Sequence, residues 1–302
     1  MSGFFNLQNF SSFRTNRGKL VSDGDEQNRR SGSGAGNRED NPPSLGQSST
    51  STALGRLDGR KAWSIVLGSF LAHLAVLGML YAFGIFVVPL SAEFNVSRAD
   101  VSLVGTIHIA FFYTGGIYSG PLADRFGVRP VMTLGATIWV LGCFLASVTN
   151  ALWQQILTQA VMVGFGASFV YWPAIAVVPQ WFDKYRGTAV GLAALGAGIG
   201  NLIFALGGQS IITALGWRNT LRVMGGVGGI LLFIAILLVE RRVPPHRTGG
   251  LFDVARRLIK LSSYRWFLVA TFLFQWGFFV PFAHLAAYAN DLGIAPTLQG
   301  LA

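Results

Sequence analysis

Seven apolar segments follow one another between residues 62 and 289, and each has the length of a membrane-spanning helix. At a rise of ~1.5 Å per residue, a helix of about 20 residues crosses a hydrocarbon core of roughly 30 Å. Backbone polar groups in lipid must be paired within such a segment, and these runs lack the alternation of a barrel strand. The sequence therefore predicts an all-α membrane protein, with spans at 62–90, 101–122, 131–149, 152–180, 188–213, 218–239 and 266–289.

Composition excludes the main soluble classes. Hydrophobic residues make up 52% of the chain and charged residues 12%, which leaves too little polar surface for a water-soluble globule. The net charge of +10 is spread between apolar runs, so it does not indicate a nucleic-acid partner. The one cysteine, Cys143, lies inside an apolar run and is expected to be a buried hydrophobe.

The basic residues predict the orientation of the chain in the membrane. Nine lie at or before Lys61, and eleven lie in the connections after the second, fourth and sixth spans. The other side has only Arg98 and Arg218, with Arg222 just inside the sixth span. Because basic residues concentrate on the cytoplasmic side, we expect a cytoplasmic N-terminus, in the plasma membrane rather than an organelle. This orientation counts against receptors of the seven-helix signalling class, whose N-terminus lies outside.

Four regions are expected along the chain. Residues 1–60 are rich in Ser, Gly, Asn and Arg and predict a disordered cytoplasmic tail without a secretory signal peptide. Residues 61–240 form an N-terminal six-helix transmembrane bundle, residues 241–265 a cytoplasmic linker, and residues 266–302 the first helix of an incomplete C-terminal bundle. Within the linker, residues 251–262 alternate apolar and basic residues and are either a surface-lying amphipathic helix or a plain basic loop.

The sharpest motif, GPLADRFGVR at residues 120–129, lies where the second span turns into the third. Gly120 permits close approach of another helix, and Gly127 permits a tight turn. Asp124 is expected to form a charge cluster with Arg125 and Arg129 at the helix terminus. The motif resembles the signature G-x-L-A-D-R-x-G-x-R/K of the major facilitator superfamily. That resemblance implies the major facilitator fold, in which these five residues would act as a cytoplasmic gate between two rocking bundles.

Further motifs resemble the monocarboxylate-porter-like branch of that superfamily. They are Asp58-Gly59 with Trp63, Tyr81-Ala82-Phe83-Gly84-Ile85-Phe86, Tyr171-Trp172-Pro173-Ala174, residues 181–193, and Gly216-Trp217-Arg218. The resemblance implies transport of a small organic solute, such as a monocarboxylate with a proton, by alternating access. Proton-coupled members of the branch carry a lysine near Tyr81 or Ala82, and no lysine lies in the first span here. This difference favours a second reading, facilitated passage of a neutral or aromatic metabolite.

Polar and aromatic residues inside the spans are candidates for the solute path, because each costs free energy in lipid unless it faces a partner or a wet cavity. An interhelical hydrogen bond remains the alternative for each one. The candidates are His73, Tyr81, His108, Tyr171, Trp172, Asn201, Gln275 and His284. The glycine pairs 116/120, 196/200 and 225/229 are expected first of all to be helix-packing faces.

Enzyme chemistry is not indicated. The sequence has no paired carboxylates within reach, Walker loop, HExxH motif or nucleophile elbow, so we expect no catalytic residue, metal or cofactor. The expected partners are the lipid bilayer and a small organic solute. The alternative is a non-transporting membrane receptor or scaffold derived from a truncated carrier.

Overall fold

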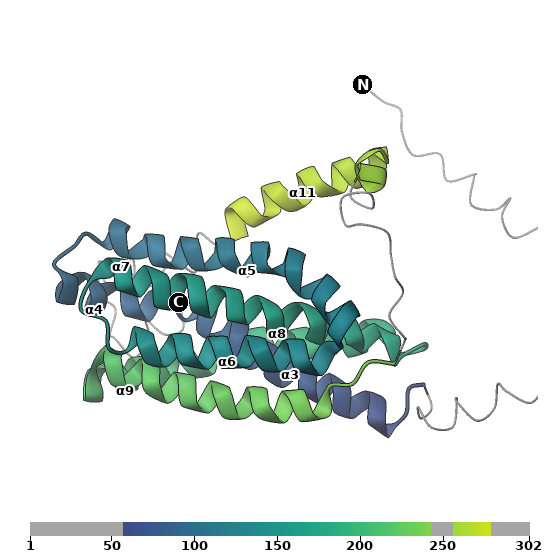
Figure 1. Cartoon of the computed structure of the whole chain (residues 1–302), viewed down its shortest axis with the longest axis horizontal. Coiled ribbons are helices and arrows are strands. Elements are labelled where there is room, and N and C mark those ends of the chain that lie inside the picture. Colours follow the sequence, from purple (N-terminus) through teal and green to yellow (C-terminus); the bar gives the residue numbers. More distant parts are fainter. Residues whose placement is uncertain (1–56, 243–255, 279–302) are drawn as a thin grey trace, which may run out of the picture. The chain divides into compact units, whose positions relative to one another are not determined.

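The computed structural model describes residues 57–242 and 256–278, and in these ranges every regular element is a helix (Figure 1). All described residues belong to the second of two units, Ser49–Ala302. The expected tail up to Arg56, the first five residues of the 251–262 segment, and the second half of the 266–289 span lie outside the described residues.

Five of the described helices are long and apolar enough to cross a membrane. The elements are α3 (Arg60–Tyr81), α4 (Gly84–Phe94), α5 (Arg98–Phe126), α6 (Val128–Ala146), α7 (Leu152–Gln155), the π-helix η2 (Ile156–Met162), α8 (Val163–Val177), the 3-10 turn η3 (Val178–Gln180), α9 (Arg186–Leu238) and α11 (Ser262–Phe278). The elements from α7 to η3 form one continuous span, Leu152–Gln180. The all-helical prediction is therefore confirmed in the described part of the chain.

The 53-residue helix α9 contains the two expected spans 188–213 and 218–239. At Gly216 the backbone leaves the helical region, with φ 79° and ψ 164°. A positive φ is easily adopted only by glycine, so Gly216 is the point at which one span ends and the next begins. Thr220 follows in the new helix and donates from Oγ1 to the Gly216 carbonyl at 2.9 Å.

The expectation of one unbroken helix over 62–90 was wrong. The chain forms α3 up to Tyr81 and then a separate helix, α4, which starts at Gly84 and contains Pro89. Glycine weakens a helix, and proline removes a backbone donor, so the helical ladder is interrupted in this stretch. An apolar run shows the length of a span but not a break within it.

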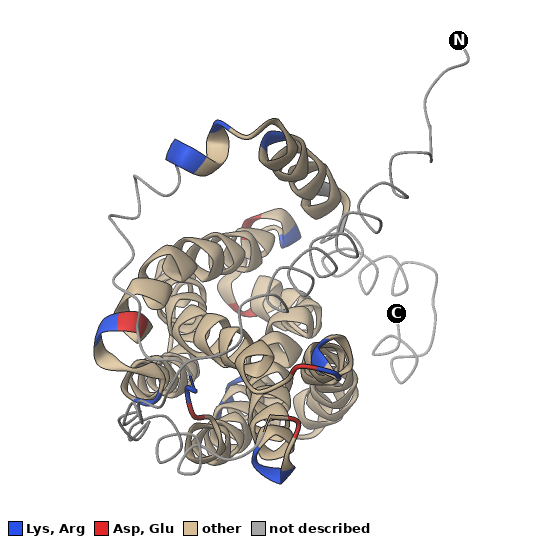
Figure 2. Ribbon diagram, turned by 90° about the vertical axis from the view of Figure 1, so that its right-hand side faces the viewer, with Lys and Arg blue, Asp and Glu red and all other residues tan. Residues whose placement is uncertain are grey.

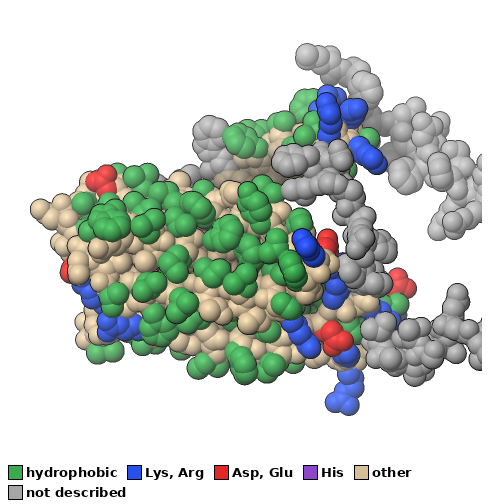
Figure 3. Space-filling model, viewed as in Figure 1, with side chains coloured by type: hydrophobic (Ala, Val, Ile, Leu, Met, Phe, Trp, Pro, Cys, Tyr) green, Lys and Arg blue, Asp and Glu red, His purple; other side chains and the backbone are tan. Residues whose placement is uncertain are grey.

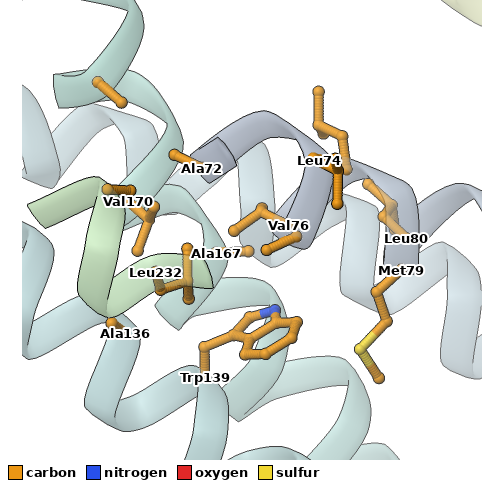
Figure 4. Packing of buried hydrophobic residues seen from close by; sticks show 14 of the residues in the cluster. Ala72, Leu74, Val76, Met79, Leu80, Ala136, Trp139, Ala167, Val170 and Leu232 are labelled. Carbon is orange, nitrogen blue, oxygen red and sulfur yellow. The ribbon is translucent and has the colours of Figure 1, made fainter. Parts of the chain in front are cut away.

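Helix α3 packs along α9 through small residues. A Cβ atom added to Gly200 would lie 2.3 Å from the backbone oxygen of Leu74, and one added to Gly196 would lie 2.2 Å from that of Phe70. Small residues let helix backbones approach closely in lipid, where helices associate by van der Waals contact. Around this contact, side chains of α3, α6, α8 and α9 belong to the buried core, and Trp139, Leu232 and Val170 are among the residues that pack there (Figure 4).

Charged side chains gather at the two ends of the helices, with hydrophobic side chains between them (Figure 3). We call the end at which α3 begins and α5 finishes the basic end. It carries Arg60, Lys61, Arg125, Arg129, Lys184, Arg186, Arg241 and Arg242. The opposite end carries Arg98, Arg218 and Arg222, and Figure 2 shows the helices end-on with charged residues at helix termini.

Candidate functional site

The turn between α5 and α6 forms as the motif predicts. Gly127 has a φ of 94°, and its N–H donates to the Ala123 carbonyl at 3.0 Å, which ends α5. A Cβ added to Gly120 would meet no atom within 4 Å, so in the described part of the chain Gly120 faces open space. This glycine therefore leaves room on α5, while Gly116, one turn earlier, is packed against Trp172.

The charged residues of the turn do not pair with one another as expected. Asp124 Oδ1 instead accepts from Arg241 Nη1 at 2.7 Å, just beyond the end of α9. Arg129 donates to the carbonyls of Leu237 at 3.0 Å and Val239 at 2.9 Å. A cation at these carbonyls is favourable, because the last turn of a helix leaves them without an intrahelical partner and carries partial negative charge. The guanidinium carbon of Arg125 lies 5.2 Å from the centroid of the Phe126 ring.

A second group of contacts at the basic end joins α3 to the ends of η3 and α9. Lys61 Nζ lies 2.9 Å from Glu240 Oε2, and Trp181 Nε1 donates to the Glu240 carbonyl at 2.8 Å. The Trp181 ring lies within 5.3 Å of Lys61 Nζ and 5.1 Å of the Arg242 guanidinium carbon. Each of these residues was expected in a span or a connection, but their mutual contact was not predicted from the sequence. The start of α3 and the ends of η3 and α9 are thereby held together around Glu240.

A cavity of about 320 Å³ lies between α5 and α8 at the basic end. Asp124 and Arg241 line it together with Trp172, and the remaining lining residues are mostly small or apolar: Gly116, Gly120, Ala123, Val128, Pro173, Ala176, Val177 and Gln180. The expected gate residues Gly120 and Asp124 thus share one cavity with the expected path residue Trp172.

Next to this cavity, which Trp172 lines, aromatic rings of α5 and α8 form a cluster. We call it the aromatic face, and it consists of Phe112, Tyr113, Tyr171 and Trp172. The Tyr171 and Trp172 rings lie 4.8 Å apart, and Phe112 lies 5.2 Å from Tyr171 and 6.0 Å from Trp172. Trp172 Nε1 donates to the Phe112 carbonyl at 3.4 Å. Phe112 is buried, whereas Tyr113 is 40% exposed, so the face runs from the core to the surface of the described bundle.

Two further path candidates adjoin the aromatic face. The His73 ring of α3 lies 4.7 Å from Tyr171. Tyr81, another candidate, is the last residue of α3 and is half-buried. Gln275 of α11 donates from Nε2 to the Tyr113 hydroxyl. Tyr113 and Phe112 were not among the expected residues, although an aromatic pair within the second span was a visible signal.

The other candidates do not join this group. His108 is buried where α5 meets the start of α8, and a Cβ added to Gly164 would lie 2.6 Å from its backbone oxygen. Asn201 lies half-buried on α9, one residue beyond the close contact with α3. His284 lies outside the described residues. The candidates brought together therefore come from the first, fourth and seventh spans, and they meet Phe112 and Tyr113 of α5, whereas the candidates in the second and fifth spans lie elsewhere.

A buried polar chain near the opposite end was missed from the sequence. Thr149 Oγ1 donates to Gln155 Oε1 at 2.5 Å, and Gln155 Nε2 donates to Gln159 Oε1. Gln155 and Gln159 lie one turn apart, where the chain enters the π-helix η2. Buried amides must find partners, and these three side chains supply one another. Two glutamines at a spacing of four in an apolar span were the available signal.

At the opposite end, Arg218 joins three segments. It donates from Nη1 to Glu93 Oε1 at 2.7 Å and from Nη2 to the Thr149 carbonyl at 2.8 Å, and it lies over the Trp217 ring. The hydrogen bond from Arg218 holds the pKa of the exposed Glu93 carboxyl below its ordinary value. The contact ties α4, the turn after α6, and the second half of α9 to one another.

Comparison with known proteins identifies similar chains. A family model described as Major Facilitator Superfamily matches residues 66–302. The MFS-type transporter pytF of Aspergillus terreus is 30% identical over 241 residues, which cover 78% of this chain and 81% of that protein. Monocarboxylate transporter 13 of Bos taurus is 30% identical over 240 residues, 79% of this chain and 56% of that protein.

Most of these relatives are longer. The chain spans 55% of the MFS-type transporter pynF of Aspergillus niger, which is 29% identical to it. Among solved structures, a POT family transporter in complex with 5-aminolevulinic acid matches with a TM-score of 0.54 and 15% sequence identity, covering 80% of this chain and 53% of that chain. At this identity the match concerns the fold alone.

Proposed function

Because this chain belongs to the Major Facilitator Superfamily, we propose that it serves the passage of a small, monocarboxylate-like organic solute by alternating access. It is a multi-pass integral membrane protein. The observation that carries the proposal is the aromatic face with His73, which lies in a part of the helices free of charged residues and ends on the cavity that Asp124 and Arg241 line.

The proposed mechanism divides the work between two groups of residues. His73, Tyr81 and the aromatic face contact the solute near the middle of the membrane. Asp124 and Arg241 join the α5–α6 turn to the first residues after α9, and this contact is made and broken as the protein changes the side to which it opens. We place the basic end in the cytoplasm, because eight of the described basic residues lie there and three at the opposite end.

Two names among the relatives support the solute class: monocarboxylate transporter 13 of Bos taurus and monocarboxylate transporter 11 of Homo sapiens. Against proton coupling through the first span stands the absence of a lysine in α3 beyond Lys61. The aromatic face instead favours a solute with an aromatic ring, since such rings stack at centroid distances of about 4.5–7 Å.

Uptake into proteoliposomes tests the function. The purified chain is reconstituted, and entry of radiolabelled lactate, benzoate and 4-hydroxyphenylacetate is measured at pH 6 and pH 8 outside, with a fixed internal pH. We expect uptake above that of protein-free liposomes. Uptake that rises at the lower external pH indicates cotransport with a proton, and equal uptake indicates facilitated passage. Absence of uptake for every solute contradicts the proposal and favours a membrane scaffold.

A further inference from the structure

His73 is held in one orientation inside the bundle. Its side chain is 1% exposed, and Nδ1 lies 2.6 Å from the carbonyl oxygen of Ser69 on the preceding turn of α3. A carbonyl oxygen only accepts hydrogen bonds, so Nδ1 carries the proton of this contact. In the neutral imidazole, Nε2 is then a hydrogen-bond acceptor with a free lone pair.

Within residues 57–242 and 256–278 that acceptor has no hydrogen-bond partner, although Nε2 of His73 is buried. Buried polar atoms are nearly always paired in native proteins, so an unpaired one calls for an explanation, such as a ligand that is absent from the structure. A protonated ring does not resolve the matter, because a buried cation in a membrane span requires an acidic partner. The charged residues of the described helices lie at the helix ends.

The surroundings of His73 define what such a ligand would be. Tyr171 is the ring that contacts His73, and Phe112 and Trp172 extend the aromatic surface away from it. Aromatic rings favour an aromatic solute by stacking.

We propose that His73 Nε2 is the specificity-determining acceptor of the solute site, which takes an aromatic solute whose ring carries a hydrogen-bond donor such as a phenolic hydroxyl. This proposal rests on the proposed function and narrows its solute class. The ring stacks on Tyr171 and Trp172 while its hydroxyl donates to His73. A carboxylate elsewhere on the solute is compatible with this arrangement.

Two monocarboxylates that differ by one methyl group, which replaces the donor hydrogen of the hydroxyl, provide the test. Equilibrium binding of 4-hydroxyphenylacetate and 4-methoxyphenylacetate to the purified chain is measured by isothermal titration calorimetry. Because a site built for a donor leaves its acceptor unpaired with the methyl ether, we expect the hydroxyl compound to bind about tenfold tighter. The variant His73→Phe keeps a ring against Tyr171 but removes the acceptor, so we expect it to reduce the preference to about twofold or less.

His73→Gln is the matched control, because its side-chain oxygen restores an acceptor, and we expect it to retain most of the preference. Equal binding of the two compounds by the native chain overturns the inference, and so does a preference that survives in His73→Phe. If both variants fail to fold, the ratio measured with the native chain still decides. If solutes are taken up but the hydroxyl compound does not bind tighter than the methyl ether, the inference is wrong and the proposed function stands. If the hydroxyl compound binds tighter but no solute is taken up, the proposed function alone is wrong.

Discussion

Reversing the charge of Asp124 with the variant Asp124→Arg is expected to lower solute uptake about tenfold. The physical cause is a change of about 1–2 kcal/mol in the free-energy difference between the two states of the transport cycle, which open to opposite sides of the membrane. The substitution places a guanidinium where the carboxylate now lies 2.7 Å from Arg241, so an attraction becomes a repulsion. The change in free energy is limited to this size because the Asp124 side chain is 46% exposed and water screens its contact with Arg241. Initial rates of uptake in proteoliposomes provide the measurement.

The exchanged pair Asp124→Arg with Arg241→Asp is the control for this prediction. It restores an ion pair of opposite polarity, and we expect uptake to recover to within about threefold of the native rate if the pairing is what matters. Unchanged uptake in Asp124→Arg would show that the contact has no part in the transport cycle. A loss that the exchange does not restore would show that the carboxylate acts on something other than Arg241.

Replacing Gly200 by valine is expected to destabilise the bundle by about 3 kcal/mol or more, at the upper end of the range for overpacking. A Cβ at this position would lie 2.3 Å from the backbone oxygen and 2.9 Å from the carbonyl carbon of Leu74. Backbone atoms cannot turn aside as a side chain does, so α3 and α9 must separate along their contact. Thermal denaturation in detergent should show a midpoint lowered by about 6–12 °C.

Gly198→Val provides the matched comparison, since a Cβ there would meet no atom within 4 Å. The glycine-to-valine change alters the helix propensity of α9 at position 198 in the same way as at position 200. The added side chain at position 198, however, meets no backbone atom of another helix. We expect its melting temperature to stay within about 2 °C of the native value, as for substitutions outside packed contacts. Equal losses in the two variants would mean that the close approach of α3 and α9 is not what the Gly196–Gly200 pair provides.

Local patterns in the sequence were enough to predict the helices, the α5–α6 turn and the family. Apolar length predicted the spans, Gly127 predicted the tight turn that its φ of 94° confirms, and the 120–129 motif led to the superfamily that the family model matches. These features depend on a few neighbouring residues, which is why one chain is sufficient to find them.

Contacts between distant residues were beyond the sequence. Asp124 has two arginines within five residues, yet it pairs with Arg241, 117 positions away, because the turn carries it to the end of α9. The break after Tyr81 was also hidden, since Gly84 and Pro89 are tolerated in many membrane helices. The packing of α3, α5 and α8 decides which polar side chains lie near the aromatic face. His73 lies beside it, whereas His108 and Asn201 do not, and the sequence contains no local signal for this difference.

The account as a whole depends on the two charged ends lying on opposite sides of a bilayer, with the Asp124 turn in the cytoplasm. Because Cys143 is buried, single cysteines introduced at the exposed positions Ala99 and Asp183 can report on each end. With a membrane-impermeant maleimide on intact cells, we predict labelling of Ala99→Cys alone, and labelling of Asp183→Cys only after permeabilisation. Labelling of Asp183→Cys in intact cells would contradict the proposed orientation and the gate that depends on it.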